Sequence, residues 1–502
     1  MADEPLGPAA PTPPIALAGG AAAVTDHLAG QRVDVPDALV ERLRSICPVD
    51  LDAGALGEAS RDWWPLAMTW ALEGQVGARA GVIAGPTTTE QVADVLRACN
   101  EAKVPVTAAA GRSGVCGGSV PVHGGVVLDL CGLAGIVSVD DDSLLLDVLP
   151  GTFGDHLEAQ LRADHGLTLG HWPQSITLST VGGWLACRSA GQLSNRYGKI
   201  EDMVVGLDVV LADGRTIHTG GAPRAAVGPD LNQLFVGSEG TLGIIVGSRL
   251  RLHPAPTHER RGAWGFPSFA AGLDACRRIL RRGGRPAVLR LYDTVESDRN
   301  FQTGDAHHVV LALDEGEPAV IDGSWAIVAE ECAAAALLDD GLVETWMGHR
   351  NDVSALEKLI SGGLVVDTME ISAPWAALPG IYEAAIAAIK GVDGALTASA
   401  HQSHAYTDGA CLYFTFAGKP APDAKDAFYR AVWDAGTHAV LDHGGALSHH
   451  HGVGLNRARF VRDALGPAFD VLVDLKGTLD PNGILNPGKL GLPSPFGEVG
   501  TW

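Results

Sequence analysis

The chain has 502 residues, of which 46% are hydrophobic and 19% are charged, and its formal net charge is −23. The length and the apolar content predict a soluble globular protein of more than one domain with a large buried core. The acidic balance argues against a nucleic-acid partner, because phosphates attract Lys and Arg, and against docking on anionic lipid through a basic patch.

The first 35 residues are rich in Ala, Pro and Gly, and acidic residues stand where a signal peptide needs positive charge. We interpret residues 1–35 as a disordered leader. No apolar run in the chain approaches the ~20 residues that span a bilayer, so we expect no transmembrane segment. The eight cysteines include no C-x-x-C pair, a pattern typical of neither a disulfide framework nor a zinc or iron–sulfur site. Together these features predict a cytoplasmic protein with reduced thiols.

Residues 36–80 are predicted to form a helical N-terminal arm, and regular β-α-β organisation begins after them. A short strand at Val82–Ala84 precedes Thr87, which stands three residues before Glu90 in the spacing of a capping box. The helix that begins there leads to a strand that runs into a loop of small residues, followed by short strands and hairpins. We assign residues 81–256 to one α+β domain.

Residues 257–468 form a second predicted domain, in which long helices alternate with strands. The segments "FPSFAAGLDACRRILRR" and "WAALPGIYEAAIAAIK" have the period of amphipathic helices. The segments "RPAVLRLYD", "HHVVLALD" and "CLYFTFAG" are typical of strands. Residues 469–502 contain the turn-forming run "DPNGILNPGKL" and are predicted to return to the first domain.

The stretch "TAAAGRSGVCGG", residues 107–118, is the part of the first domain that is richest in small side chains. All of it except Arg112 and Val115 is Gly, Ala, Ser, Thr or Cys, so backbone N–H groups can approach a bound anion. The stretch matches neither G-x-G-x-x-G nor G-x-x-x-x-G-K-[ST], and it follows a strand without opening a helix, which argues against a Rossmann site. By itself it fits a phosphate cradle and a plain tight turn equally well.

Further motifs follow this loop in a fixed order, namely "STVGG", "YGKIED" and "GSEGTLGII". This order resembles the FAD-binding domain of the vanillyl-alcohol oxidase/p-cresol methylhydroxylase superfamily, and "DPNGILNPGKL" resembles the end of its flavin-linked oxidases. In addition, "GHWPQS", "VLRLYD", "DTMEISAPW", "GACLYFTF" and "SHHHGVG" resemble alkyldihydroxyacetonephosphate synthase. The resemblance runs from roughly residue 81 to residue 490. It implies an α+β fold, with a two-subdomain FAD-binding domain of p-cresol methylhydroxylase type and a C-terminal cap domain built on an antiparallel sheet.

The resemblance implies non-covalent FAD, held by four groups of residues that match the superfamily motifs. The loop would hold the pyrophosphate through Ala109, Ala110, Gly111, Arg112, Ser113 and Gly114, continued by Val115, Gly117 and Gly118. The second group is His171, Ser175, Ser179, Thr180, Gly182 and Gly183, and the third is Asn195, Tyr197, Gly198, Ile200, Glu201 and Asp202. The fourth group is Glu239, Gly240, Thr241, Gly243 and Ile244. Cys116 and His123 are the residues that could form a covalent flavin link instead.

The resemblance also implies which residues lie on the substrate side of the flavin. They are the tyrosine of the "GACLYF" strand, the three consecutive histidines and the arginine of "VLRLYD", that is, Tyr413, His449, His450, His451 and Arg290. One departure concerns a family arginine that is expected to meet a substrate phosphate. Leu356 stands at that place, and leucine cannot replace a bidentate guanidinium. This departure argues against a phosphate-bearing substrate, although Arg350 or Lys358 could reach in from nearby.

The histidine run allows three interpretations, namely a metal site, a solvated surface tract and a buried active-site loop. A metal would need a third or fourth ligand, and no acid or cysteine stands beside the run, so we expect no metal. The neighbouring glycines and the family position favour the active-site loop. On a strand, alternation would put His449 and His451 on one face and His450 on the other.

Two reactions fit this set of residues. In the first, flavin N5 accepts a hydride from an alcohol or a 2-hydroxy acid while a histidine, His450 by family position, acts as the base. In the alternative, an alkylglycerone-phosphate synthase reaction, alkoxide replaces the acyl group of acyl-dihydroxyacetone phosphate through a flavin N5 adduct without net redox change. We favour the first because of Leu356. The expected partner is a small-molecule or lipid substrate, and a homodimer is compatible with the sequence.

Overall fold

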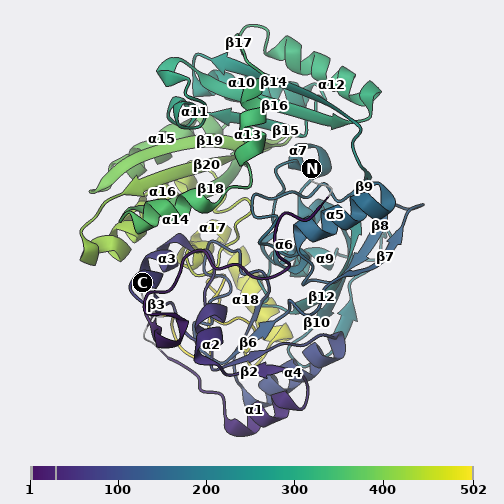
Figure 1. Ribbon diagram of the computed structural model, residues 1–502, viewed down its shortest axis with the longest axis vertical. Helices are drawn as coiled ribbons and strands as arrows, with labels where there is room; N and C mark the ends of the chain where they lie inside the picture. The colour runs from purple at the N-terminus through teal and green to yellow at the C-terminus, as the bar shows by residue number, and fades with distance from the viewer. Residues whose placement is uncertain (1–3, 29–30, 500–502) are drawn as a thin grey trace.

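A computed structural model describes residues 4–28 and 31–499, which form two lobes (Figure 1). The lower lobe contains a small sheet in the order β2-β4-β6-β5. Its strands are β2 (Val49–Asp50), β4 (Val82–Ala84), β6 (Val126–Asp129) and β5 (Val106–Ala109). β4, β6 and β5 run parallel, and β2 pairs with β4 in the antiparallel direction. The sheet is covered by α1 (Asp37–Arg44) and α4 (Thr89–Ala102), which contact each other.

Helix α4 shows how the local sequence builds this layer. Its predicted apolar face is confirmed, because Val92, Val95, Leu96 and Cys99 are fully buried. The helix begins one residue later than the capping-box spacing predicts, since the hydroxyl of Thr88 accepts the N–H of Gln91.

The lower lobe also contains an antiparallel sheet in the order β11-β10-β12-β8-β7. Its strands are β11 (Thr216–His218), β10 (Val204–Val210), β12 (Ile244–Arg251), β8 (Leu145–Val148) and β7 (Ile136–Asp140). Helices α5 (Gly154–His165) and α6 (Val181–Cys187) belong to this subdomain, and α6 contacts β12.

The upper lobe is built on an antiparallel sheet in the order β17-β14-β16-β15-β19-β20-β18. Its strands are β17 (Ala336–Leu338), β14 (His258–Phe266), β16 (His308–Gly316), β15 (Val288–Tyr292), β19 (Ala395–Ala405), β20 (Gly409–Gly418) and β18 (Val365–Pro374). Helices α10 (Phe269–Arg281), α12 (Pro318–Glu331), α15 (Leu378–Lys390) and α16 (Lys425–Asp442) pack on it (Figure 1). The predicted α+β fold, with two FAD-domain subdomains and a cap built on an antiparallel sheet, is confirmed.

Shorter elements connect these layers. The helices are α2 (Ala53–Ala59), α3 (Pro65–Ala71), α7 (Ser194–Tyr197), α8 (Ile200–Met203), α9 (Asn232–Phe235), α11 (Thr294–Phe301), α13 (Gly341–His349), α14 (Ser354–Ser361), α17 (Val461–Leu465) and α18 (Ala468–Leu479). The strands are β1 (Thr25–Asp26), β3 (Gln75–Val76), β9 (Leu167–Thr168) and β13 (His253–Pro254). In the part of the chain that the structure describes, no helix has the length and apolar character that a membrane span requires.

The N-terminal segment differs from the predicted disordered leader. Ile15 and Leu17 are buried in a cluster with Met68 of α3 and Ile360 of α14. The backbone N–H groups of residues 6 and 7 donate to the carboxylate of Asp155, and β1 pairs with β3. These few contacts cannot be inferred from the Ala/Pro/Gly composition of the segment. Residues 1–3 and 29–30 of the predicted leader lie outside the described residues.

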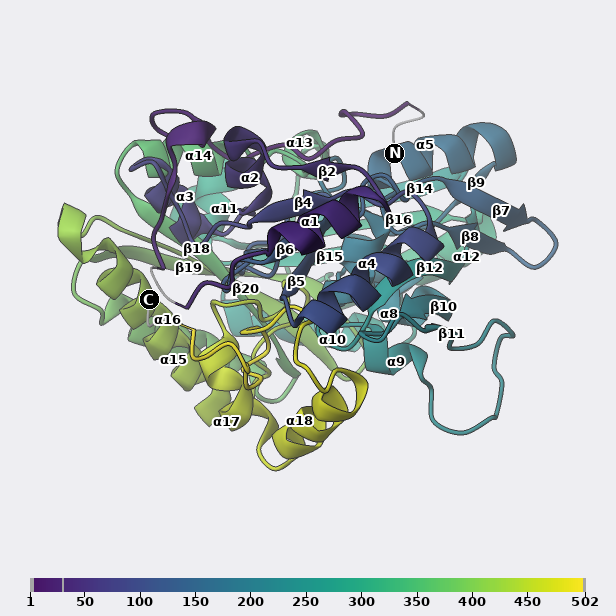
Figure 2. The ribbon, with the colours of Figure 1, turned by 90° about the horizontal axis from the view of Figure 1, so that it is seen from below.

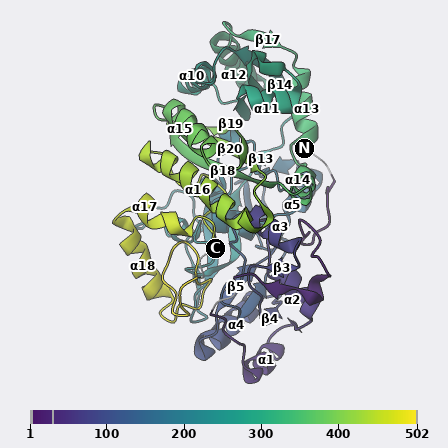
Figure 3. The same ribbon diagram turned by 90° about the vertical axis from the view of Figure 1, so that its left-hand side faces the viewer.

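The C-terminal segment lies against the lower lobe, beside both subdomains. Helices α17 and α18 are at one side of the molecule, below the cap helices (Figures 2 and 3). The N–H of Val106 in β5 donates to the carbonyl of Ile484, and the N–H of Asn486 donates to the carbonyl of Val106. The Asn486 side chain also donates to the carbonyls of Gly118 and Glu239. The tail thereby fixes two of the loops that carry the predicted cofactor residues.

Candidate active site

A cavity of about 910 Å³ lies where the two lobes meet. Its wall combines the loops 108–119, 173–192 and 238–245 of the lower lobe with side chains of the cap sheet and of α13 and α14. This volume is at the upper end of the roughly 300–1,000 Å³ that is typical of ligand pockets. The cavity therefore has room for a large organic cofactor.

The small-residue loop reaches the cavity because β5 ends at Ala109 and the chain turns there. A Cβ added at Gly111 would lie 2.2 Å from the carbonyl oxygen of Leu178, so only glycine lets the two loops meet. In contrast, a Cβ added at Gly118 or Gly240 meets no heavy atom closer than 3.8 Å. The bare backbone at these two positions faces open space, as an anion cradle requires.

Two hydroxyl groups on the same wall are buried and have no hydrogen-bond partner among the described residues. They belong to Ser119 and Thr180, which line the cavity beside the glycine-rich loops. A buried hydroxyl without a partner costs free energy, so a polar ligand such as the phosphates and the ribityl chain of a flavin dinucleotide fits this wall. The residues present are thus compatible with FAD.

Most of the predicted cofactor residues line the cavity. They are Ala109, Ala110, Gly111, Arg112, Ser113, Gly114, Val115, Gly118, Ser175, Ser179, Thr180, Gly182, Gly183, Glu239, Gly240, Gly243 and Ile244. The structure brings these residues together from three separate stretches of the chain. Their contacts with FAD stay predictions.

The other predicted cofactor residues are not on the cavity wall. They are Gly117, His171, Asn195, Tyr197, Gly198, Ile200, Glu201, Asp202 and Thr241. Several of their side chains are used elsewhere, because motif position does not determine where a side chain points. Asn195 accepts the N–H of Ala405 at 3.0 Å, Tyr197 donates to Glu315 at 2.8 Å, and Asp202 accepts the N–H of Lys199 at 2.9 Å. These three join neighbouring segments, including the cap, to the lower lobe.

The histidine run is a loop and not a strand, so its side chains do not alternate between two faces as predicted. The loop wraps the carboxylate of Glu370 in β18. The backbone N–H groups of His449, His450 and His451 all donate to this carboxylate, and the Ser448 hydroxyl donates at 2.8 Å. As a result His450 and His451 line the cavity together and His449 lies behind them, which corrects the predicted pairing of His449 with His451.

The charge of Glu370 is paired with that of Arg457, and neither residue was among the predicted site residues. The two charges are 2.9 Å apart and both side chains are fully buried. Burial alone would raise the pKa of Glu370, but the Arg457 guanidinium and the loop N–H groups lower it below its usual value. The signal for the pair was present, since a charge inside the apolar run "DTMEISAP" is costly unless it is paired. The pair fixes the shape of the histidine loop.

The predicted Tyr413 belongs to β20 of the cap sheet, and its side chain contacts the histidine loop. Its hydroxyl lies 3.2 Å from Nε2 of His451, and it accepts the hydroxyl of Thr368 at 3.2 Å. Burial raises the pKa of Tyr413 and lowers that of His451 to about 4. Both groups are therefore neutral near pH 7 and suited to hydrogen bonding with a ligand oxygen.

Two further histidines, His401 and His404 of β19, line the cavity and were not predicted. Residues three apart on a regular strand face opposite sides. Here the register of β19 shifts between Gln402 and His404, and this irregularity lets both rings reach the cavity. His401 lies 2.8 Å from the carboxylate of Glu296, and its ring stacks on Tyr413 at 4.9 Å.

Two arginines on the wall have no carboxylate within 4.0 Å among the described residues. They are Arg290 of β15, which is one of the predicted site residues, and Arg350 at the end of α13; each is 9% exposed. Their guanidinium groups lie 5.5 Å and 5.8 Å from the ring of Trp346. Burial lowers the pKa of Arg350 to about 10. Two buried cations beside one aromatic ring make a site for an anionic group.

The place of the missing family arginine is apolar in the structure as well. Leu356 of α14 lines the cavity with Leu359, whereas Lys358 is not on the wall. Of the two cations that could have reached in, the structure places Arg350 at the cavity.

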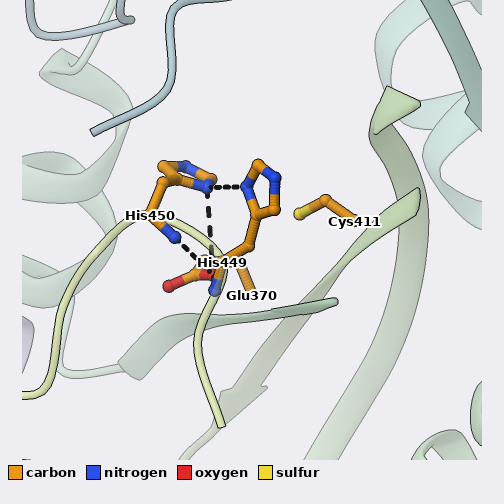
Figure 4. Close-up of side chains that lie close together, drawn as sticks. All are labelled: Glu370, Cys411, His449 and His450. Carbon is orange, nitrogen blue, oxygen red and sulfur yellow. Dashed lines mark hydrogen bonds and ion pairs between the residues drawn. The ribbon is translucent and has the colours of Figure 1, made fainter. Parts of the chain in front are cut away.

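Four side chains near the wall could together bind a metal ion, namely Glu370, Cys411, His449 and His450 (Figure 4). The carboxylate of Glu370 already accepts three N–H groups, a hydroxyl and a guanidinium. Without an ion nearby, burial raises the pKa of the Cys411 thiol, so this group is protonated at neutral pH. The absence of a metal stays a prediction, and the chemistry of the cluster argues against a carboxylate-bound ion.

The comparisons with known proteins agree with this architecture. Residues 80–220 match a family model described as FAD binding domain, and residues 255–490 match one described as FAD linked oxidases, C-terminal domain. The uncharacterized FAD-linked oxidoreductase YgcU of Escherichia coli is 32% identical over 424 residues, covering 80% of this chain and 87% of the relative. The alkyldihydroxyacetonephosphate synthase of Dictyostelium discoideum is 30% identical over 454 residues, covering 83% and 74%.

Solved structures give the same result. A structure of alkyldihydroxyacetonephosphate synthase superposes with a TM-score of 0.76 and 26% identity, covering 92% of this chain and 87% of that one. Substrate-bound p-cresol methylhydroxylase has a TM-score of 0.73 at 18% identity, covering 91% and 96%, which shows the shared fold. The cofactor is FAD. The chain belongs to the family of FAD-linked oxidoreductases that also contains the alkyldihydroxyacetonephosphate synthases.

Proposed function

We propose that the protein oxidises a small 2-hydroxy acid or a related alcohol, with His450 as the base. The observation that carries this proposal is the pair Arg290 and Arg350, two buried cations without a carboxylate partner among the described residues, in the same cavity as the histidines. A carboxylate placed between them would satisfy both guanidinium groups. The hydroxyl on the neighbouring carbon would then lie on the histidine side of the cavity.

Different side chains of the cap have different roles in this reaction. FAD, when bound, supplies the acceptor for the hydride of the substrate carbon. His450 takes the hydroxyl proton, and burial together with the nearby His451 and Lys199 keeps its pKa well below the usual value, so the ring is unprotonated before the reaction. Tyr413 and His451 orient the substrate oxygen, while Trp346 and Leu356 exclude water from the carbon side.

A second candidate is the exchange of an acyl for an alkoxy group on acyl-dihydroxyacetone phosphate. The specific support is the similarity to the Dictyostelium synthase and to the synthase structure. In this reaction Arg290 and Arg350 would bind the substrate phosphate. The apolar residue at Leu356 argues against it, because one expected phosphate ligand is absent.

We further propose that FAD is bound non-covalently. Cys116 lines the cavity, but burial raises the pKa of its thiol well above the usual value, which makes it a poor nucleophile. His123 is not on the wall, and its two ring nitrogens contact the carbonyl of Gln31 and the hydroxyl of Ser494. Acid precipitation tests this proposal directly, since it should release all of the yellow chromophore into the supernatant.

The proposed reaction is tested by mixing the purified flavoprotein anaerobically with a series of 2-hydroxy acids and simple alcohols. At least one 2-hydroxy acid should bleach the oxidised flavin absorbance. The matched variant His450→Ala should keep FAD and bleach far more slowly. If nothing in the series bleaches the flavin, while acyl-dihydroxyacetone phosphate and a fatty alcohol yield an ether, the second candidate is correct.

A further inference from the structure

A continuous chain of hydrogen bonds leaves the cavity at one histidine and returns to it at another. Nδ1 of His450 lies 2.9 Å from Nδ1 of His449 (Figure 4), and Nε2 of His449 lies 3.0 Å from the hydroxyl of Tyr406. That hydroxyl lies 3.3 Å from Oγ of Ser194, which lies 2.8 Å from Nδ1 of His404. His450 and His404 line the cavity, whereas the three residues between them do not.

Every member of this chain can both donate and accept a proton. A neutral imidazole has one N–H and one lone pair, and a hydroxyl group can do both at once. The Nδ1–Nδ1 contact is a hydrogen bond only if one ring is protonated at Nδ1 and the other is not. The proton positions of all five residues are therefore coupled. The protons can be arranged in two ways, with the Nε2 proton at the end of the series either on His450 or on His404.

The surroundings make a positive charge on these rings unfavourable. Burial lowers the pKa of His404, His449 and His450 well below the usual value. The charged groups that face them add to this, because Lys199 and Arg290 are cationic and the Glu370 carboxylate is already paired with Arg457. A base that had to hold the substrate proton as an imidazolium would be weak here.

We propose that His450, His449, Tyr406, Ser194 and His404 form a proton relay, so that His450 acts as a base without becoming an imidazolium. This proposal rests on the proposed oxidation of a hydroxyl substrate. In this relay His450 touches the substrate, and Tyr406 and Ser194 act through the histidines.

The step balances when each member passes on one proton. The substrate O–H bond breaks and its proton goes to Nε2 of His450, whose Nδ1 proton moves to Nδ1 of His449. The Nε2 proton of His449 moves to the oxygen of Tyr406, the hydroxyl proton of Tyr406 moves to Ser194, and that of Ser194 moves to Nδ1 of His404. His404 then releases its Nε2 proton to a water molecule in the cavity. The two electrons leave the substrate carbon with the hydride, which FAD accepts in the proposed function.

The relay is tested with Tyr406→Phe and Ser194→Ala in the full-length flavoprotein, with Tyr382→Phe as a matched control outside the cavity wall. Stopped-flow flavin reduction should slow by at least ~10-fold in both relay variants, with little change in substrate affinity, because general-base catalysis contributes roughly 10²–10⁴-fold. The rate in H₂O/D₂O mixtures should curve for the wild type, since several protons move together, and become linear for Tyr406→Phe. Wild-type rates in both relay variants would overturn the proposal.

A second readout needs no substrate and separates this proposal from the proposed function. With ¹⁵N-labelled histidine, the ring-nitrogen spectrum should change in Tyr406→Phe at two or more coupled imidazoles and stay as in the wild type in Tyr382→Phe. An unchanged spectrum in Tyr406→Phe would refute the relay even if hydroxy acids bleach the flavin. A changed spectrum would support it even if none of the tested substrates reacts. Stoichiometric zinc in the purified protein, lost together with activity on chelation, would also overturn it, because a metal would then occupy the Nδ1–Nδ1 contact.

Discussion

Replacing Arg350 by methionine should have opposite effects on stability and on substrate binding. Methionine keeps much of the apolar stem that packs near Trp172 and Trp346 and removes the charge. Burial lowers the pKa of Arg350 from 12.5 to about 10, which means that folding disfavours the charged form by roughly 3 kcal/mol at 1.36 kcal/mol per unit. The lost cation–π contacts, with rings 5.1 Å and 5.8 Å away, offset about 1–2 kcal/mol of this. The free protein should therefore become more stable, by about 1–2 kcal/mol.

The same variant should bind an anionic substrate more weakly. A hydrogen bond to a charged group contributes about 1.5–3 kcal/mol, which corresponds to roughly 10–150-fold in affinity. Thermal unfolding of the flavoprotein with and without a 2-hydroxy acid measures both effects at once. The ligand should raise the midpoint of the wild type and have little effect on Arg350→Met. If the variant is less stable and its ligand affinity is unchanged, Arg350 is a structural residue and the anion site is wrongly placed.

Three other changes test separate parts of the account. Gly111→Ala should lower the FAD content of the purified protein, measured by absorbance, because its Cβ would lie 2.2 Å from the Leu178 carbonyl oxygen; full occupancy would contradict the tight loop contact. Glu370→Gln should destabilise the protein by about 3–5 kcal/mol in denaturant titration, since it leaves Arg457 buried without its partner, and a neutral result would mean that the pair does not hold the histidine loop. Stability should fall as the pH drops from 6.5 toward 4, because burial lowers the pKa of His451 to about 4 and those of His404, His449 and His450 well below the usual value, so that the unfolded chain binds protons more tightly. His451→Gln should reduce this dependence by the share of one histidine, and an unchanged pH profile would speak against it.

The fold was predictable to the extent that the sequence carries local signals and ordered motifs. The apolar face of α4, the loop after β5 and the strands of the cap follow from periodicity and composition. The leader was predicted incorrectly, because the packing of Ile15 against Met68 and Ile360 depends on contacts far apart in the sequence. Composition cannot report such contacts.

The site was predictable where sequence motifs determine the course of the backbone. It was less predictable where its side chains come from segments far apart in the sequence. The glycine-rich loops and Tyr413 line the cavity, and their contacts with FAD and substrate stay predictions. His401 and His404 were missed because an irregularity in β19 overrides strand alternation, and the pairing of His449 with His451 was wrong because the run is a loop around Glu370. Arg350, which the sequence offered only as a nearby cation, lies on the cavity wall because of its place between α13 and α14, which no spacing rule reveals.

The most direct test of the central claim compares flavin reduction by a 2-hydroxy acid with reduction by the matching neutral diol, under anaerobic conditions. The acid should bleach the flavin at least ~10-fold faster at equal concentration, because only the acid engages Arg290 and Arg350, and Arg350→Met should remove most of this preference. Equal rates for the two compounds, or no bleaching by either, would contradict an oxidoreductase that selects its substrate by a negative charge.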